Sequence, residues 1–321
     1  MIITRTPLRV SFAGGLSDIP AYYNRLGEGK VTSVTINKYV YVMVNDKFDN
    51  DIRVAYKKYE DVSKVSDISH PIVKACLKKF KVKEGIEIST IADIPGGTGL
   101  GSSSAFTVGL VNALSTYCGH DLNKRELAEY ACEIEIDTLK ENIGKQDQYA
   151  CAFGGFNKFT FHRGESVVVD PIHISKGCIH NMEDRLLMFY LQSNGKSSDV
   201  LKDQIATFEE NSHVMLNLLH IADDIYKKLN SEDIEIGELL HKAWGYKKQM
   251  KGVTDKYIDS LYAKCLYHGA QGGKVCGAGG RGFLMMYATP GYKGVVRSKI
   301  DVPYVDVKFE DKGSVIVYDD S

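Results

Sequence analysis

The spacing of apolar residues divides the first part of the chain into strands and one surface helix. Residues 31–44 are rich in β-branched and aromatic side chains, and near the end of this segment both the odd and the even positions are apolar. This pattern predicts a strand covered on both faces. Residues 2–12 and 52–56 predict strands by the same composition. Residues 71–80 carry apolar side chains at helical spacing with lysines between them, so this segment predicts a surface helix.

A second block of strands and helices follows. Residues 85–92 predict a strand, a glycine-rich segment interrupts the pattern, and residues 102–118 predict an apolar helix. Residues 123–141 predict an amphipathic helix with Asn123 as its N-cap. Residues 156–170 predict strands that end at a proline turn.

The pattern changes near residue 180, where we place a boundary between domains 1–180 and 181–321. Mostly helical sequence follows, with three expected helices near 199–229, 235–250 and 254–268. Strands are expected at 283–288, 302–309 and 314–319, the last two paired around a turn at 311–313. This order of elements predicts a mixed α+β protein.

Length and charge narrow the possible functions. The chain has 321 residues, about twice a usual domain of roughly 150, and its 41 acidic residues nearly balance 40 Lys and Arg. A chain with so little net charge has no overall field that attracts nucleic acid or an anionic membrane, so we expect neither as a partner. Any anion must therefore bind at a local site.

The sequence also lacks the signals of export, disulfide frameworks and zinc sites. Its apolar stretches fall short of the roughly 20 residues that span a bilayer. Arg5, Pro7 and Arg9 stand where a signal peptide needs an apolar core, so we expect a cytoplasmic protein. Its seven cysteines never occur as C-x-x-C, which argues against a disulfide framework and a zinc site. No obligate protein partner is evident.

The strongest chemical signal is a glycine-rich segment between a strand and a helix. Gly96, Gly97, Gly99 and Gly101 lie within six residues, and three serines follow. Such a backbone turns tightly and directs N–H groups at an anion, and the helix N-terminus adds partial positive charge. The pattern predicts a phosphate site, with a flexible loop capped by Ser102 as the alternative. No lysine follows the glycines, which disfavours a P-loop NTPase.

A second glycine cluster, residues 277–282, matches G-x-G-x-x-G. A dinucleotide site needs a strand before this motif and a helix after it, whereas here a helical pattern precedes and a strand follows. The context therefore excludes that site. A tight loop before a buried strand and a functional role both remain open.

The helix expected at 123–141 places one carboxylate unusually. Its apolar arc is formed by Leu127, Ala131, Ile134 and Thr138, and Glu126, Glu129 and Glu133 lie opposite. Glu135 falls at the edge of the apolar face, where an ionised carboxylate is costly without a partner. A salt bridge to Lys or Arg explains this placement, and a magnesium ion beside bound phosphates is the alternative.

Asp147 lies between two glutamines in IGKQDQYACAFGGF, near a turn or helix start. An aspartate in that setting is often only an N-cap. Close in sequence to Glu135, it could instead accept a proton from a substrate hydroxyl.

Four segments, taken together, resemble the GHMP kinases, the superfamily of galactokinase, homoserine kinase, mevalonate kinase and phosphomevalonate kinase. They are TPLRVSFAGGLSDIPAY, PGGTGLGSSSA, IGKQDQ and KVCGAGGRGF, and their order spans nearly the whole chain. Within the superfamily the sequence is most similar to bacterial D-glycero-D-manno-heptose 7-phosphate kinases. The resemblance implies a ribosomal S5-like N-terminal domain and an α+β C-terminal domain, with the active site between them.

The resemblance also implies ATP, Mg²⁺ and a small sugar phosphate as ligands. The implied ATP phosphate loop comprises Gly96, Gly97, Thr98, Gly99, Leu100, Gly101, Ser102, Ser103 and Ser104. Ser103 and Glu135 would hold Mg²⁺, and Asp147 would be the catalytic base. Arg9 and Asp18 would lie at the substrate hydroxyls, and Gly279, Gly280 and Arg281 would lie against the phosphate loop and the substrate.

Two positions depart from the family pattern. Gly15 stands where galactokinases carry Glu, which disfavours galactose, and Arg281 replaces a usual small residue. Lys196 and Arg281 are the candidate contacts to a phosphate remote from the reacting hydroxyl, with exposure of Arg281 to solvent as the alternative.

The implied activity is phosphorylation of the anomeric O1 of D-glycero-D-manno-heptose 7-phosphate, on the route to nucleotide-activated heptose for surface polysaccharide. A 1-kinase for fucose or another hexose is one alternative. A non-catalytic nucleotide or sugar sensor is another, although the intact Asp147, Glu135 and Ser103 argue against it.

Overall fold

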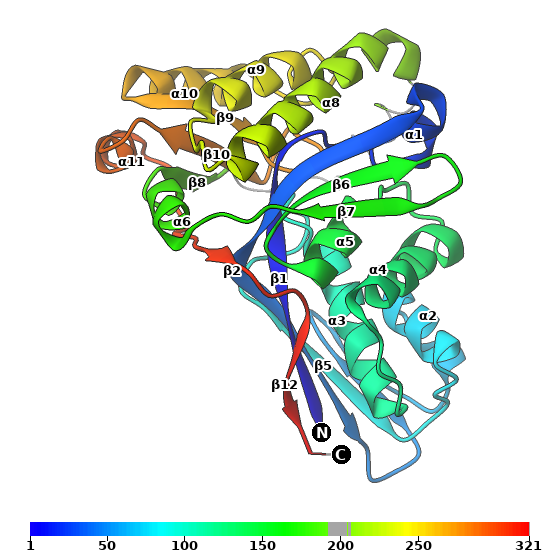
Figure 1. The fold of residues 1–321 in the computed structure, drawn as a ribbon. Helices are drawn as coiled ribbons and strands as arrows, with labels where there is room; N and C mark the ends of the chain where they lie inside the picture. The colour runs from blue at the N-terminus through cyan, green and yellow to red at the C-terminus, as the bar shows by residue number, and fades with distance from the viewer. Residues whose placement is uncertain (192–203, 205–206, 321) are drawn as a thin grey trace.

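The computed structural model describes residues 1–191, 204 and 207–320. A large mixed sheet forms the centre, and a small antiparallel sheet lies beside the helices of the second half (Figure 1). No helix in these ranges is long and apolar enough to cross a membrane.

The large sheet is organised around one long strand, β2. Its strands are β1 (Ile2–Ala13), β2 (Glu28–Asp46), β3 (Ile52–Ala55), β4 (Tyr59–Val62), β5 (Ile86–Ala92), β6 (Phe156–His162), β7 (Val167–Pro171), β11 (Phe309–Glu310) and β12 (Val315–Asp319). The main path runs β12-β1-β2-β5-β3-β4. β2 pairs with β6 at its start and with β5 at its end, while β1 follows its other edge. The expected strand at 31–44 is therefore confirmed as the centre of the sheet.

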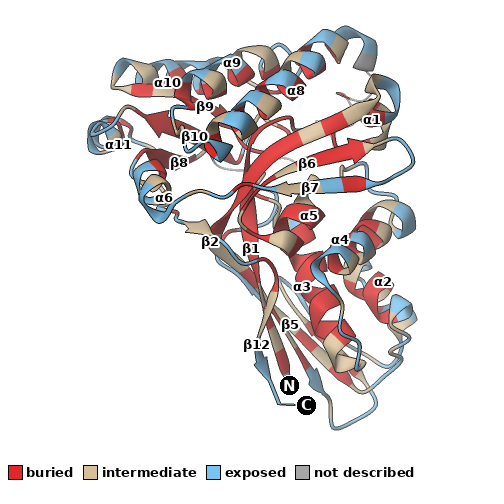
Figure 2. Cartoon of the chain, in the orientation of Figure 1, coloured by how far each residue is buried: buried red, intermediate tan, exposed pale blue. Residues whose placement is uncertain are grey.

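The helices of the first half cover one face of this sheet (Figure 1). They are α1 (Pro20–Leu26), α2 (Pro71–Lys79), α3 (Ser102–Tyr117), α4 (Lys124–Cys132) and α5 (Gln146–Phe153), with the short helices η1 (Val65–Asp67) and η2 (Glu133–Thr138). α3 is buried along most of its length, which agrees with the apolar helix expected at 102–118 (Figure 2). It lies directly on β1, where the Thr4 hydroxyl donates to the Gly109 carbonyl at 3.0 Å.

The second half forms a smaller layer. Its elements are α6 (Lys176–Glu183), β8 (Leu186–Tyr190), α8 (Phe208–Asn230), α9 (Gly237–Lys247), α10 (Lys256–Tyr267), β9 (Ala270–Val275), β10 (Phe283–Ala288) and α11 (Lys293–Lys299). The strand order is β8-β10-β9. α8 joins the layers, because Thr32 of β2 donates to the Ala222 carbonyl at 2.8 Å and Lys30 pairs with Asp223 at 2.7 Å.

Two expectations about strands are wrong. Residues 302–309 and 314–319 do not pair with each other, because β11 pairs with β2 and β12 with β1. The turn between them is held elsewhere, with the Ser314 N–H donating to the Cys151 carbonyl of α5. The cluster at 277–282 is preceded by β9 and not directly by a helix, so it connects two antiparallel strands.

The helix expected at 123–141 is correct at its start and changes winding later. Asn123 caps α4 and forms a capping box with Glu126. From Glu133 the chain continues as the π-helix η2, whose wider turn changes the register of the face. Thr138 is consequently exposed and not part of the apolar arc. The boundary expected near 180 stays a prediction, while β11 and β12 return to the first sheet.

Candidate active site

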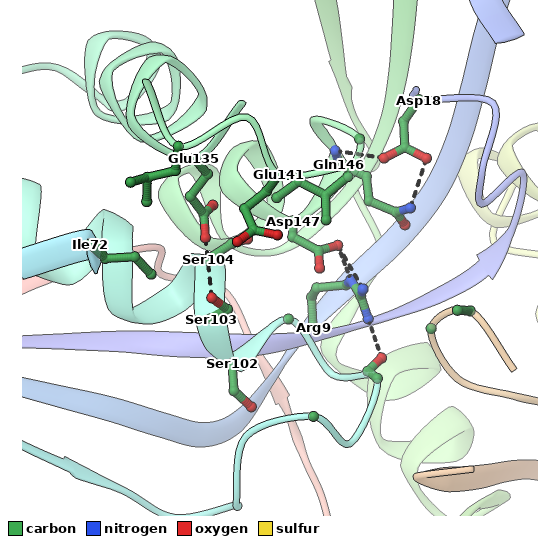
Figure 3. Close-up of a pocket in the computed structure, with 18 of the residues that line it drawn as sticks. Arg9, Asp18, Ile72, Ser102, Ser103, Ser104, Glu135, Glu141, Gln146 and Asp147 are labelled. Carbon is green, nitrogen blue, oxygen red and sulfur yellow. Dashed lines mark hydrogen bonds and ion pairs between the residues drawn. The ribbon is translucent and has the colours of Figure 1, made fainter. Parts of the chain in front are cut away.

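A cavity of about 660 Å³ collects most of the predicted site residues (Figure 3). Those that line it are Arg9, Asp18, Gly97, Gly99, Gly101, Ser102, Ser103, Ser104, Glu135 and Asp147. They come from β1, the loop after it, the glycine loop, the first turn of α3, η2 and α5. Gly96, Thr98 and Leu100 belong to the glycine loop but do not line the cavity.

The glycine loop presents an uncapped helix N-terminus. Gly97, Gly99 and Gly101 have φ angles of 78°, 79° and 79°, a region that strongly favours glycine. Gly101 is the N-cap of α3, and no side chain caps the helix. The Ser102 Oγ is buried with no hydrogen-bond partner among the residues described, so the cap by Ser102 that the alternative required is not present in that part of the chain. The first-turn N–H groups and this hydroxyl fit an anion such as phosphate.

The second glycine loop packs against the first. A Cβ at Gly99 would lie 2.5 Å from the Cys276 carbonyl oxygen, and one at Gly277 would lie 2.6 Å from the Gly99 Cα. Glycine at both positions therefore permits a close backbone contact. Gly277 lines the cavity.

Three more of the predicted substrate residues are not at the cavity wall, and a fourth is not described. Gly279, Gly280 and Arg281 do not line it, and Arg281 is exposed. Lys196 lies outside the described residues. Their contact with a substrate stays a prediction.

Asp147 is held by a buried arginine. The Arg9 side chain is 3% exposed; its Nε donates to Asp147 Oδ1 at 2.7 Å and its Nη1 donates to the Gly99 carbonyl at 2.7 Å. Burial opposes the charge of Arg9, but the Asp147 carboxylate outweighs it and raises the arginine pKa. Lys145, not Asp147, is the N-cap of α5, so the capping alternative is wrong. The second carboxylate oxygen of Asp147 makes no drawn bond in Figure 3.

Glu135 is almost fully buried beside the glycine loop. Its side chain accepts from the Gln148 amide at 2.6 Å and from the Ser103 hydroxyl at 3.3 Å. It pairs with no Lys or Arg of the described chain, so the salt-bridge alternative is wrong. Burial raises the pKa of this carboxyl to about 7.

Asp18 forms the other end of the site with a residue that the sequence did not single out. Its two carboxylate oxygens accept from the side-chain amide of Gln146 at 2.9 Å and from the Gln146 backbone N–H at 3.1 Å (Figure 3). Burial, followed by the nearby charge of Asp147, raises the pKa of Asp18 to about 6. The only sequence signal for Gln146 was its place next to Asp147.

An apolar end of the cavity was also not predicted. Tyr56, His70, Pro71 and Ile72 line it, and the rings of Tyr56 and His70 meet edge to face at 4.7 Å between centroids. Flat apolar walls of this kind suit an aromatic ring system.

The residues fit magnesium only together with a phosphate ligand. No cluster of three or more metal-ligating side chains occurs in the described ranges. Glu135 and Ser103 nevertheless provide a carboxylate and a hydroxyl, and Mg²⁺ is commonly bound by one or two carboxylates plus substrate phosphates.

Comparison with known proteins agrees with this geometry. The sequence profile "GHMP kinases N terminal domain" matches residues 68–155, which include the glycine loop, Glu135 and Asp147. Over these residues the chain is similar to the GHMP kinases. The whole chain superposes on the crystal structure of a D-glycero-D-manno-heptose 1-phosphate kinase from Bacteroides thetaiotaomicron with a TM-score of 0.84, 25% identity and 100% of both chains covered. The implied GHMP kinase fold is thus confirmed.

Two curated relatives are similar over most of the chain. It is 29% identical to the D-glycero-alpha-D-manno-heptose 7-phosphate kinase of Campylobacter jejuni over 90% of each chain. It is 25% identical to the L-fucokinase/L-fucose-1-P guanylyltransferase of Bacteroides fragilis, over 96% of this chain and 38% of that protein.

Proposed function

We propose that the protein transfers the γ-phosphoryl group of ATP to the anomeric O1 of D-glycero-D-manno-heptose 7-phosphate. The observation that carries this proposal is the placement of Asp147 and an uncapped, serine-rich helix N-terminus in one cavity. The relatives named as heptose phosphate kinases support the acceptor. We place the reaction in the cytoplasm, on the route to nucleotide-activated heptose for surface polysaccharide.

The nucleotide occupies the part of the cavity between the glycine loop and the apolar end. The first-turn N–H groups of α3 and the Ser102 hydroxyl bind the phosphates, and the base packs between Tyr56, His70 and Ile72. Ser103 and Glu135 would hold Mg²⁺, which when bound neutralises charge on the transferred phosphoryl group.

The acceptor occupies the part between Asp147 and Asp18. Asp147 accepts the hydrogen bond of the anomeric hydroxyl at Oδ2, since Arg9 contacts Oδ1, and receives that proton on transfer. Arg9 fixes the Asp147 carboxylate and ties it to the Gly99 carbonyl of the glycine loop. The two reacting groups are thus positioned by one buried side chain, which is the main requirement of phosphoryl transfer.

A substrate panel tests the proposal. ATP consumption is measured with heptose 7-phosphate, mannose 6-phosphate, mannose, fucose and galactose, and NMR locates the new phosphate. We expect turnover of heptose 7-phosphate with phosphate added at C1. Efficient use of fucose or another unphosphorylated hexose, without activity on heptose 7-phosphate, would instead favour the 1-kinase that the similarity to the fucokinase suggests.

Asp147→Asn tests the catalytic assignment. We expect kcat to fall by roughly 10²- to 10⁴-fold with little change in KM for ATP, because the amide cannot take the proton. The variant should also unfold at lower temperature, since Arg9 loses its anionic partner in a buried position. A kcat equal to that of the parent would contradict the assignment.

A further inference from the structure

Two buried lysines lie behind the acceptor end of the cavity. Lys274 of β9 and Lys247 of α9 are 3% and 4% exposed. Neither forms an ion pair with any carboxylate in the described part of the chain. Buried ammonium groups without a counter-ion are unusual, because their desolvation is costly.

Because Lys274 donates to the Ser11 oxygen, the Ser11 hydroxyl of β1 can donate its own hydrogen into the cavity. The Lys274 Nζ donates to the Ser11 carbonyl at 2.8 Å and to the Ser11 Oγ at 3.2 Å, and Ser11 lines the cavity. An ammonium group can only donate, so the Ser11 oxygen is the acceptor in this contact. No acceptor for the Ser11 hydroxyl proton occurs among the described residues, which leaves it available to a ligand.

Lys247 adds a second charge behind the same wall. Its Nζ donates to the carbonyl of Gly277, which also lines the cavity. Burial and then the neighbouring Lys274 lower the pKa of Lys247, and burial lowers the pKa of Lys274 to about 8. An anion in the cavity would raise the pKa of both groups.

The position of Ser11 matches the far end of a sugar phosphate. Arg9 and Ser11 lie two residues apart on β1 and both line the cavity, so they are about 7 Å apart along the strand. Arg9 donates to Asp147, and the proposed function places the reacting hydroxyl at Asp147. The reacting hydroxyl therefore lies near Arg9. Lys58, the other cation at the cavity wall among the residues described, lies with Tyr56 at the apolar end.

We propose that Ser11, backed by Lys274 and Lys247, binds the phosphate monoester of the acceptor at the end remote from O1. This inference rests on the proposed function. It assigns the substrate phosphate to residues other than Lys196 and Arg281. It predicts that residues of β1 and β9 make the protein prefer a phosphorylated sugar to an unphosphorylated one.

Ser11→Ala and Ser33→Ala form a matched pair for the kinetic test. Ser33 faces Ser11 across the β1–β2 pair, is equally buried, and its Oγ has no partner in the described chain. We expect Ser11→Ala to raise KM for heptose 7-phosphate by about 10- to 100-fold, with KM for ATP and for unphosphorylated heptose unchanged. Ser33→Ala should change none of these values. An equal effect of Ser11→Ala on both sugars would overturn the proposal.

Calorimetry provides a readout that a structural role would not move. At pH 8 and without ATP, binding of heptose 7-phosphate to the parent protein should take up protons, because the phosphate raises the depressed pKa of Lys274. Unphosphorylated heptose should cause no uptake, and Lys274→Met should reduce the uptake caused by the phosphorylated sugar. Binding of the sugar phosphate without proton uptake would overturn the proposal, even if Lys274→Met failed to fold.

The two hypotheses fail in different ways. No turnover of heptose 7-phosphate by the parent enzyme would refute the proposed function. Normal turnover with equal effects of Ser11→Ala on both sugars would refute only the phosphate site.

Discussion

At the scale of single residues, the site depends on two buried carboxylates, neither of which has a cationic partner among the residues described. Asp18 is held by Gln146, and Glu135 by Gln148 and Ser103. Amide and hydroxyl donors compensate buried negative charge only in part, which is why the pKa of each carboxyl is raised. Both groups are therefore arranged to receive a ligand that stabilises their charge.

The sequence predicted the carboxylates but not the residues that hold them. Glu135 and Asp147 stood out because a charge at an apolar edge and an aspartate between amides are local patterns. The contacts of Gln146 with Asp18 and of Lys274 with Ser11 join residues separated by 128 and 263 positions. Such contacts depend on the fold and leave no local pattern.

Glu135→Gln and Glu133→Gln separate metal binding from general destabilisation. We expect Glu135→Gln to raise the Mg²⁺ concentration for half-maximal activity by roughly 10- to 100-fold, because it removes the charge beside Ser103. Glu133 instead pairs with Lys79 at 2.6 Å and its side chain is 45% exposed, so its substitution should have little effect. Activity measured against Mg²⁺ concentration tests this expectation for both variants. A larger increase in the required Mg²⁺ concentration for Glu133→Gln than for Glu135→Gln would refute the metal assignment.

Asp18→Asn should make stability depend less on pH. The folded pKa of Asp18 is about 6 against an ordinary value of 3.8, so the folded state binds the proton more tightly and ionisation above pH 4 to 6 costs stability. The variant removes this cost, and the free Gln146 Oε1 can accept from the new amide after rotation. We expect it to be more stable than the parent by roughly 3 kcal/mol at pH 8, with most of this gain lost near pH 4.

Urea unfolding of both proteins across that pH range measures the difference. A stability difference that does not change with pH would show that Asp18 does not titrate as described.

At the scale of elements, winding and close packing modify what periodicity predicts. The helical pattern over 123–141 located α4 correctly, but the change to a π-helix at Glu133 is a property of packing that an average spacing cannot show. Glu135 is buried within this π-helix, whereas Thr138 at its end is exposed.

A pair of glycines tests the packing of α3 on the sheet. A Cβ at Gly109 would lie 2.8 Å from the Thr6 Oγ1 and 3.3 Å from the Thr4 Oγ1, whereas one at Gly245 in α9 would have nothing within 4 Å. Gly109→Ala should lower the free energy of unfolding by about 1 to 3 kcal/mol despite the better helix propensity of alanine. Gly245→Ala should raise it by about 0.5 to 1 kcal/mol.

Urea midpoints of the two variants check this contrast. Stabilisation by both substitutions would mean that α3 does not approach β1 as closely as described.

At the scale of the whole molecule, the order of elements predicted an α+β protein and the resemblance predicted the GHMP kinase fold. Neither predicted which strands the end of the chain pairs with. Strands 283–288 and 314–319 were recognisable because they are short and apolar. The pattern of a strand does not show, however, which other strand it pairs with. β12 pairs with the first strand and β11 with the second, so the end of the chain completes the sheet that its beginning starts. The two termini lie together, with the Asp320 N–H donating to the Met1 carbonyl (Figure 1).

This closure predicts that residues 1–173, cut in the loop before α6, will not fold alone. The fragment lacks β12, which covers the outer edge of β1, and α8, which packs on β2. An uncovered strand edge and sheet face favour aggregation. A circular permutant with the same cut, in which a short flexible linker joins residue 320 to residue 1, retains every element and should unfold cooperatively and keep its activity. Circular dichroism melting and size-exclusion chromatography distinguish the two proteins. A monomeric fragment with a cooperative transition would show that the first domain is autonomous and that the C-terminal strands are dispensable to it.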